Sequence, residues 1–277
     1  MKKTVFLLCL SAALGLSSCR MNTGGRPLMG GNIGAERAVD ETGGRQDVAA
    51  GEDIGLPAMR PQSGEQILRR TAYTAAYDKA TRLPVWVAWH LTADHTSGAN
   101  KRNGMKFAED EDVPVPRATD SDYYNSGYDR GHMCPSADCK WSAEAQRESF
   151  MFTNCCPQNH GLNVGDWNEM EQQCRRWTEE WGSLYIVSGP VLYKGRHKTI
   201  GRNKVVVPEA FFKVLLCMEG RPKAIGFIYK NEGGNRPKSS YVNTVDQVER
   251  ITGLDFFAAL PDDVETAVEA QANIEEW

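Results

Sequence analysis

The sequence predicts an α+β fold in which helices flank a central, largely antiparallel sheet. Two apolar runs, 211–217 and 224–229, stand on either side of the turn residues 220–222 with the spacing of a β-hairpin. Helical stretches lie between the other strand candidates, but strands and helices do not alternate strictly, as they would in a parallel sheet. A length of 277 residues suits one catalytic domain of about 200 residues with extra segments at its ends.

The ordered part of the chain is predicted to begin near Gln66. Its first strand candidate is the short apolar run 85–89, which follows a proline as a buried strand would. A second candidate, 184–188, runs into a Gly-Pro pair that ends it. Together with the hairpin, these runs supply the strands of the predicted sheet.

Three stretches are predicted to be helical, namely 143–150, about 164–181, and 245–252. The third has signals at both of its ends. Thr244 and Gln247, three residues on, form a capping box, and Gly253 supplies the stop.

The catalytic domain is predicted to span residues 66–262, and the segments on either side differ from it in composition. Residues 20–65 are rich in glycine and have no apolar period, which predicts a disordered linker, with a dispensable leader as the alternative. Residues 263–277 are acidic and are predicted to form a solvated helix.

Residues 1–19 have the regions of an export signal, with Lys2 and Lys3 before an apolar run over 5–16 and small residues that end in Cys19. The apolar run is too short to span a bilayer. Leu-Ser-Ser-Cys also resembles the lipobox of bacterial lipoproteins, in which the cysteine is acylated. We therefore expect an exported protein that is lipid-anchored to the bacterial cell envelope through Cys19, or secreted after cleavage of an ordinary signal.

Eight cysteines occur, and two of them belong to the signal segment. In an exported protein the other six could pair as disulfides, but the sequence does not choose among the possible connectivities. Their spacing does not match the two separated knuckles of a structural zinc site. These cysteines are Cys134, Cys139, Cys155, Cys156, Cys174 and Cys217.

The formal net charge of −4 argues against a protein that holds nucleic acid by bulk electrostatics, since non-specific affinity comes mainly from cations that neutralise phosphates. A degrading enzyme needs positive charge only at its site, and tight product binding would slow it. The charge therefore leaves an enzyme that acts on nucleic acid open.

The densest chemical signal is the segment 128–135, Tyr-Asp-Arg-Gly-His-Met-Cys-Pro. Phosphodiester hydrolysis needs a base that deprotonates water, a divalent cation, and positive charge that balances the transition state. His132 is the only one of the five histidines flanked by both a carboxylate and a guanidinium, and neutral imidazole accepts protons near neutral pH. We take His132 as the candidate general base, and the alternative is a structural histidine beside a turn glycine.

Asn163 is predicted at or near the cap of the helix 164–181, where its side-chain oxygen is a hard ligand of the kind that Mg²⁺ accepts. The alternative is a cap that binds no metal. Glu171 lies eight residues on, about 12 Å along a helix, with Trp167 midway. Because helical side chains lean toward the N-terminus, Glu171 could reach a metal-bound water, and the alternative is a simple surface carboxylate.

The chain resembles the DNA/RNA non-specific endonuclease family, which includes endonuclease G and secreted bacterial nucleases. The motif that carries the resemblance consists of Asp129-Arg130-Gly131-His132, Asn154, Pro157-Gln158, Leu162-Asn163, Trp167 and Glu171. The likeness extends over about residues 70–262 and includes Lys101-Arg102-Asn103, Ser188-Gly189-Pro190 and Phe212-Lys213-Val214. The departures are Met133 after the histidine and the cysteines that crowd the motif segments.

The resemblance implies a ββα-metal nuclease fold on a six-stranded antiparallel sheet. It implies one Mg²⁺, with Mn²⁺ as the alternative ion, held by Asn163 and waters, and non-specific cleavage of DNA and RNA that leaves 5′-phosphate ends. By position, it implies His132 as the base, Arg102 and Arg130 as phosphate contacts, and Glu171 as the partner of metal-bound water. Two other functions stay open, a nucleic-acid-binding surface lipoprotein with weak catalysis and a phosphodiesterase of narrower substrate range.

Overall fold

The structure is a computed structural model that describes residues 53–58 and 64–277. The predicted signal segment 1–19 lies outside the described residues, as does most of the predicted linker 20–65. Among the helices of the described part, none has both the length and the apolar composition that a membrane crossing requires.

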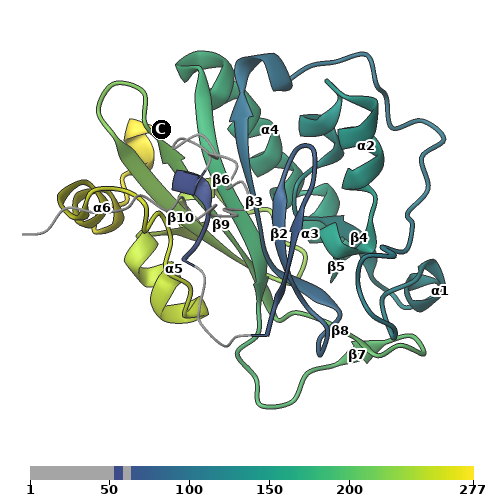
Figure 1. The fold of residues 1–277 in the computed structure, drawn as a ribbon. Coiled ribbons are helices and arrows are strands. Elements are labelled where there is room, and N and C mark those ends of the chain that lie inside the picture. The colour runs from purple at the N-terminus through teal and green to yellow at the C-terminus, as the bar shows by residue number, and fades with distance from the viewer. Residues whose placement is uncertain (1–52, 59–63) are drawn as a thin grey trace, which may run out of the picture. The chain divides into compact units, whose positions relative to one another are not determined.

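An antiparallel sheet forms the centre of the described fold (Figure 1). Across it, its seven strands are ordered β1 (Gln66–Arg69), β2 (Thr74–Asp78), β3 (Leu83–Thr92), β6 (Ser183–Val191), β9 (Ala210–Cys217), β10 (Lys223–Lys230) and β11 (Val242–Asn243). The strands predicted from the sequence are confirmed as β3, β6, β9 and β10, and so is the α+β class. The resemblance implied six strands, whereas the described sheet has seven and ends in the two-residue edge strand β11.

The sheet separates two apolar layers, because successive side chains of a strand point to opposite faces. On the interior strand β9, Phe211 faces one layer and Phe212 faces the other. The layer of Phe211 lies under α4 (Asp166–Trp181), and we call this side the α4 face. The layer of Phe212 lies under α5 (Val245–Thr252) and α6 (Asp262–Glu269) and forms the α5–α6 face (Figure 1).

The remaining helices are α1 (Asp120–Tyr123), α2 (Ala143–Ser149), α3 (His160–Val164) and the 3₁₀ helices η1 (Asp53–Gly55), η2 (Ala93–His95), η3 (Ser136–Cys139), η4 (Phe152–Asn154), η5 (Lys238–Tyr241) and η6 (Ile274–Glu276). The predicted helices 143–150 and 245–252 are confirmed as α2 and α5. The capping box of α5 forms as predicted, since Thr244 Oγ1 accepts from the Gln247 N–H at 3.1 Å. Gly253 ends the helix with a left-handed φ of 66°.

The helix predicted over about 164–181 is confirmed as α4, and a separate short helix, α3, precedes it. The break lies at Gly165, where a Cβ would stand 2.6 Å from the carbonyl oxygen of Gly161, so that only glycine fits. The cap of α3 is Asn159, whose side chain accepts from the Gly161 N–H at 2.9 Å. Asn163, predicted at or near the cap of the helix 164–181, is not the cap itself, because α4 is capped at Gly165 and Asn163 lies two residues before it, inside α3.

Two short antiparallel pairs accompany the main sheet. One is formed by β4 (Asp129–His132) and β5 (Cys155–Gln158), and the other by β7 (Thr199–Ile200) and β8 (Val205–Val206). The sequence did not predict β4 and β5, because both segments are short and lack the apolar run by which a strand is recognised. Residues of both pairs belong to the apolar layer of the α4 face (Figure 1).

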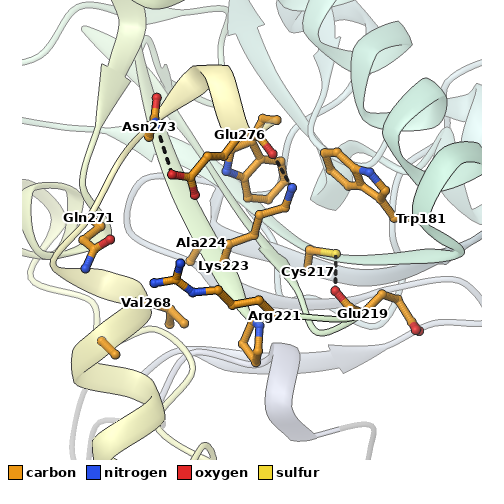
Figure 2. A pocket seen from close by; sticks show the side chains of 13 residues that line it. Trp181, Cys217, Glu219, Arg221, Lys223, Ala224, Val268, Gln271, Asn273 and Glu276 are labelled. Carbon is orange, nitrogen blue, oxygen red and sulfur yellow. Dashed lines mark hydrogen bonds between the residues drawn. The ribbon is translucent and has the colours of Figure 1, made fainter.

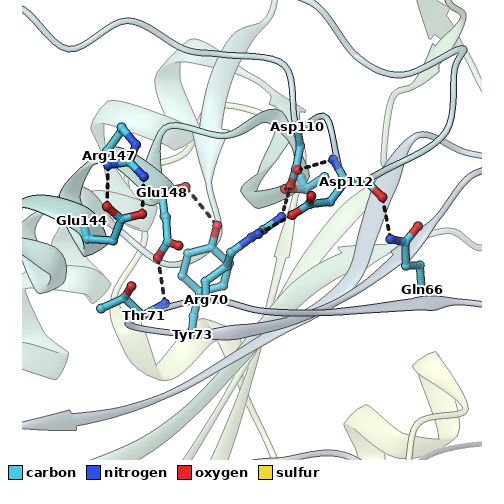
Figure 3. A network of polar contacts seen from close by, with 10 residues as sticks. Gln66, Arg70, Thr71, Tyr73, Asp110, Asp112, Glu144, Arg147 and Glu148 are labelled. Carbon is cyan, nitrogen blue, oxygen red and sulfur yellow. Dashed lines mark hydrogen bonds and ion pairs between the residues drawn. The ribbon is translucent and has the colours of Figure 1, made fainter.

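A buried polar network fixes the segments that surround β4. Figure 3 shows Arg70, just after β1, bonded to Asp110 at 2.7 Å. The same carboxylate accepts from the Thr153 hydroxyl at 2.5 Å. The network therefore ties the turn after β1 to the segments that carry Phe107 and Phe150, which line the candidate active site.

The acidic segment 263–277 is helical in its first part, as predicted, but its end packs against the protein. The ring of Trp277 lies 5.4 Å from that of Trp181 on α4. Lys223 stands beside both rings, with its Nζ 3.6 Å from the Trp181 ring centre (Figure 2). The prediction of a solvated tail is thus wrong for its last residues, because the sequence does not show that the terminal tryptophan meets partners from distant elements.

Candidate active site

The motif residues 129–132 form β4, and their alternation sets which side chains share a face. Residues two apart on a strand point the same way, so Arg130 and His132 lie on one side. Gly131, between them, faces the buried side chain of Gln158, and a Cβ there would lie 2.3 Å from Gln158 Oε1. The glycine of the motif is therefore needed for the close pairing of β4 with β5.

Three polar side chains hold the backbone around His132. Each comes from a different element, and each bonds a main-chain group within residues 132–134, where β4 ends. The bonds run from Trp167 Nε1 to the His132 carbonyl at 3.2 Å, from Ser188 Oγ to the Met133 carbonyl at 3.0 Å, and from the Cys134 N–H to Asn154 Oδ1 at 2.9 Å. These contacts therefore fix the backbone position of the histidine.

The imidazole of His132 lies among aromatic rings and is only 9% exposed. The ring of Phe107 is 5.1 Å away, and that of Phe150 meets it edge-on at the same distance. Its Nε2 is enclosed and has no hydrogen-bond partner among the described residues. Packing therefore fixes the ring orientation and closes Nε2 to water.

Burial lowers the pKa of His132 to about 3, and the positive charge of Arg102 acts in the same direction. The imidazole is therefore neutral near pH 7, which is the form that accepts a proton. A phosphodiester anion beside the ring would oppose the effect of Arg102, because nearby negative charge favours the protonated form. Bound substrate would thus make His132 a stronger base.

Arg102 reaches the candidate site from the loop between β3 and α1. Its guanidinium carbon lies 5.5 Å from the ring centre of Phe150, which also contacts His132. Its charge lowers the pKa values of both His132 and Glu171. Among the described residues, no carboxylate pairs with it, so its donors are available to a phosphate.

Arg130 is engaged by a carboxylate. Its Nε donates to Asp120 Oδ1 at 2.8 Å, and its guanidinium lies over the rings of Phe107 and Tyr123. Together with Lys106, Phe107 and Asp120, it lines a depression of about 350 Å³. The Asp120 side chain is 66% exposed, and exposed ion pairs contribute only about 0–1 kcal/mol, so a phosphate could replace this partner.

Asn163 is held by the strand that carries His132. Its Nδ2 donates to Asp129 Oδ2 at 2.9 Å, and His160 Nδ1 lies 2.8 Å from the same oxygen. Because the amide nitrogen is directed to Asp129, the amide oxygen points away from that carboxylate. The structure therefore brings the predicted base and the predicted metal ligand to one short strand.

The donors around Asn163 fit a hard divalent cation. An amide oxygen with a carboxylate next to it suits Mg²⁺, which keeps several waters and needs few protein ligands. Among the described residues, one group of three acidic side chains also lies close enough for an ion, but it is on the α5–α6 face and consists of Asp246, Glu249 and Glu269. An ion at the candidate site would thus rest on Asn163 and water.

Glu171 is half-buried on α4, one turn beyond Trp167. Burial raises its pKa to about 7, against the opposing charges of Lys213 and Arg102. Lys213 is itself buried between the rings of Trp89 and Trp167, with its Nζ at 5.0 and 4.4 Å from their centres. Near neutral pH, Glu171 is present in both charged and protonated forms and can hold water by accepting or donating.

Four residues of this site received no role from the sequence. Asp129 stood inside the motif, and its position next to the arginine was the available signal. Lys213 could have been noticed as the one charge in an otherwise apolar strand. Phe107 and Phe150 gave no signal, since their contact with the histidine depends on tertiary packing.

The six cysteines of the described region are free thiols and are all buried. Cys134 Sγ lies 3.8 Å from Cys139 Sγ, just after the strand that carries His132. Burial raises the pKa of Cys155 and Cys156 beside the site, which keeps both thiols protonated. The disulfides that the sequence left open are absent among the described residues.

The family model for DNA/RNA non-specific endonucleases matches residues 52–263. The chain belongs to this family. It is 36% identical to the mitochondrial nuclease EXOG of Xenopus laevis over 219 residues, which cover 73% of this chain and 61% of that protein. It is 31% identical to human mitochondrial endonuclease G, with 73% and 71% covered. The chain thus spans about three fifths of the EXOG relatives it matches.

Structural comparison supports the same family. The EndoG chain from a crystal structure of the EndoG/EndoGI complex aligns with a TM-score of 0.71 and 27% identity, and the alignment covers 79% of this chain and 95% of that one. The prediction of a ββα-metal nuclease fold is therefore confirmed.

The predicted location is wrong by these comparisons. EXOG and endonuclease G are mitochondrial nucleases, which contradicts the expectation of export and of attachment to a bacterial envelope. The acyl anchor predicted at Cys19 gains no support from them, and Cys19 lies outside the described residues.

Proposed function

We propose that this family member is a metal-dependent endonuclease that hydrolyses phosphodiester bonds in DNA and RNA without sequence preference. The observation that carries the proposal is a neutral, rigidly packed His132 on the same strand as Asp129, which orients the amide of Asn163. A neutral imidazole and an amide oxygen supply the two functions that hydrolysis needs, a proton acceptor and a hard ligand.

In the proposed reaction, His132 takes a proton from water at Nδ1, since Nε2 is enclosed. The water oxygen forms a bond to phosphorus in line with the departing 3′ oxygen, and the bond between phosphorus and that oxygen breaks. The leaving oxygen takes a proton from solvent. The products are a 5′-phosphate and a 3′-hydroxyl, and His132 then returns its proton to water.

The cations of the site would offset the charge that develops on the phosphate. No carboxylate in the described part of the chain pairs with Arg102, and Arg130 can exchange Asp120 for a phosphate oxygen. Both side chains present rigid donor forks. Mg²⁺ at Asn163 would supply further positive charge to the phosphate and the leaving oxygen. Glu171 would position water by hydrogen bonds. Because these contacts are all to the backbone, they position the substrate without reading bases.

The test is digestion of supercoiled plasmid and of single-stranded RNA by the purified chain, with Mg²⁺ and with excess EDTA. We expect both substrates to be cut in Mg²⁺ and neither in EDTA. Binding of plasmid without cleavage would replace the proposal with a nucleic-acid-binding protein. Turnover restricted to small phosphodiesters would replace it with a phosphodiesterase of narrow range.

A further inference from the structure

A second polar cavity, of about 510 Å³, adjoins the candidate active site. We call it the basic groove and define it by Tyr128, Tyr193, Lys194, Arg196, Lys198 and Lys230. Its cationic side chains are all exposed, and none has a carboxylate within 4.0 Å among the described residues. In a chain with a net charge of −4, such a concentration of unpaired positive charge indicates a polyanion site.

The carboxylates that line the groove leave these cations unpaired. Glu209 is directed to the 193–198 loop instead of to these cations. It accepts from the Tyr193 N–H at 3.2 Å and lies 3.1 Å from His197 Nδ1. It therefore shapes the 193–198 loop. Glu232 pairs with Arg236. The groove thus keeps an excess of positive charge.

Two connections join the groove to the candidate active site. Tyr128 precedes Asp129 on the chain, and its hydroxyl accepts from Lys198 Nζ at 3.3 Å. On the other side, Asn231 Oδ1 accepts from the N–H of Asn159, the cap of the helix that carries Asn163, at 2.7 Å. A polynucleotide held in the groove would therefore continue toward the scissile position.

The aromatic residues indicate which form of polynucleotide fits. Tyr193 is 60% exposed, and Lys194 Nζ lies 6.0 Å from its ring centre, so that a planar partner could stack on the exposed part of the ring beside this cation. An open ring next to backbone-binding cations is typical of single-strand sites, because bases are free to stack only when they are unpaired. Duplex DNA presents phosphates but no accessible base faces.

We propose that the basic groove is a subsite for single-stranded DNA or RNA flanking the scissile bond. Lys194, Arg196, Lys198 and Lys230 bind successive phosphates, and a base stacks on Tyr193. This inference rests on the proposed nuclease function and locates part of its substrate. It also explains how a protein of negative net charge retains a polynucleotide.

The test measures binding separately from cleavage. In EDTA, and in a His132→Ala background, the affinity for a fluorescein-labelled 15-nucleotide oligo(dT) is followed by anisotropy at several salt concentrations. We expect the combined changes Lys194→Glu and Lys198→Glu to weaken binding at least about tenfold and to reduce the salt slope by about 1.4, since each single-strand contact contributes about 0.7. The matched control, Arg69→Glu with Arg221→Glu, carries the same charge change outside the groove and should have a smaller effect.

The stacking part of the proposal has its own variant. Tyr193→Ala should weaken oligo(dT) binding at least about fivefold and leave binding of a blunt duplex nearly unchanged. Equal losses for both nucleic acids, or no loss for oligo(dT), would overturn the stacked base. If the groove variant and its control lose the same affinity for oligo(dT), the groove is not a subsite. The same conclusion follows if the groove variant loses as much affinity for heparin as for oligo(dT).

Substrate length separates this inference from the proposed function. For the cleavage assay in Mg²⁺, the groove substitutions are made in the protein that keeps His132. They should raise KM for a 20-nucleotide strand and leave kcat/KM for a dinucleotide unchanged, because a dinucleotide cannot reach from the candidate active site into the basic groove. If the wild-type chain binds oligo(dT) through the groove but cuts nothing, the proposed function fails and the groove stands. If long strands are cut with an unchanged KM in the groove variant, the groove fails alone.

Discussion

The two faces of the central sheet differ in how many polar side chains they bury. The α5–α6 face is packed almost entirely with apolar residues, such as Phe212 and Phe256, whose rings meet at 5.5 Å. The α4 face also has a large apolar cluster, but it encloses His132, Lys213 and Asp138 as well. Burying polar groups costs stability unless they are paired. Asp138 is paired with Arg175 at 2.7 Å, but Nε2 of His132 has no partner among the described residues, so the burial of His132 costs stability.

The cost on the α4 face coincides with the candidate chemistry. There, burial lowers the pKa of His132, which keeps the proposed base neutral, and raises the pKa of Glu171 to about 7. Shifted pKa values cluster at functional sites for this reason. We infer that the α5–α6 face contributes mainly to stability, whereas the α4 face carries the candidate active site at a cost in stability.

The largest effect on stability is expected on the α5–α6 face. Phe256→Ala should lower the free energy of unfolding by about 3–5 kcal/mol, because it empties a fully buried ring site. At a temperature where the variant stays folded, kcat should equal that of the wild type. Urea unfolding together with a plasmid assay checks both statements. A loss of turnover in the folded variant would contradict the idea that the α5–α6 face affects stability and not turnover.

The largest effect on turnover is expected on the α4 face. His132→Ala should lower kcat at least about 10²-fold, equivalent to about 2.7 kcal/mol, since the proton acceptor is lost. The matched control is His90→Ala, which removes a histidine that stacks on Tyr185 at the surface of β3. Near-wild-type cleavage by the His132 variant would remove this residue from the mechanism.

The fold was predictable where its elements have a period or a cap. β3, β6, β9 and β10 are apolar runs, and α5 has its capping box and terminal glycine, so local sequence suffices for them. β4 and β5 were not predictable in this way, because they are four-residue segments stabilised by pairing with each other. The break at Gly165 depends on how closely two helices meet, which the pattern does not encode.

The site was predictable where it follows the family motif and not where it depends on packing. The motif identified His132, Asn163, Arg102, Arg130 and Glu171 as candidates, and their assigned roles stay predictions. Tertiary contacts decide the rest. The aromatic rings that contact His132 belong to Phe107 and Phe150, which lie 25 and 18 residues away along the chain. The sequence pattern also does not show that Arg130 pairs with an aspartate.

A smaller effect separates metal affinity from stability on the α4 face. Asn163→Ala should raise the Mg²⁺ concentration for half-maximal activity at least about tenfold, because an oxygen ligand is lost. Thermal stability should change little, since the amide is only partly buried and makes one side-chain bond. Asn168→Ala, five residues further along the chain on α4, is the matched control. An unchanged Mg²⁺ dependence would refute the ligand assignment.

The smallest effect concerns Glu269, a buried carboxylate of the α5–α6 face. Burial and the nearby charges of Glu249 and Glu265 raise the pKa of Glu269 from 4.5 to about 8. Between these two values the unfolded chain ionises while the folded protein keeps its proton, so stability falls as pH rises from about 4.5 to about 8. Glu269→Gln cannot ionise and should therefore exceed the wild-type Tm by about 2–4 °C at pH 8, with little difference at pH 5.

Scanning calorimetry in EDTA tests this prediction, because the chelator removes any cation held by the carboxylates around Glu269. The exposed Glu275→Gln serves as the control for the loss of one negative charge. If both variants change Tm equally, or if the gain at pH 8 persists at pH 5, titration of Glu269 is not the cause. A gain confined to Glu269→Gln at high pH would show that even the apolar face holds a group whose burial costs stability, and that the two faces differ in the number of such groups rather than in their presence.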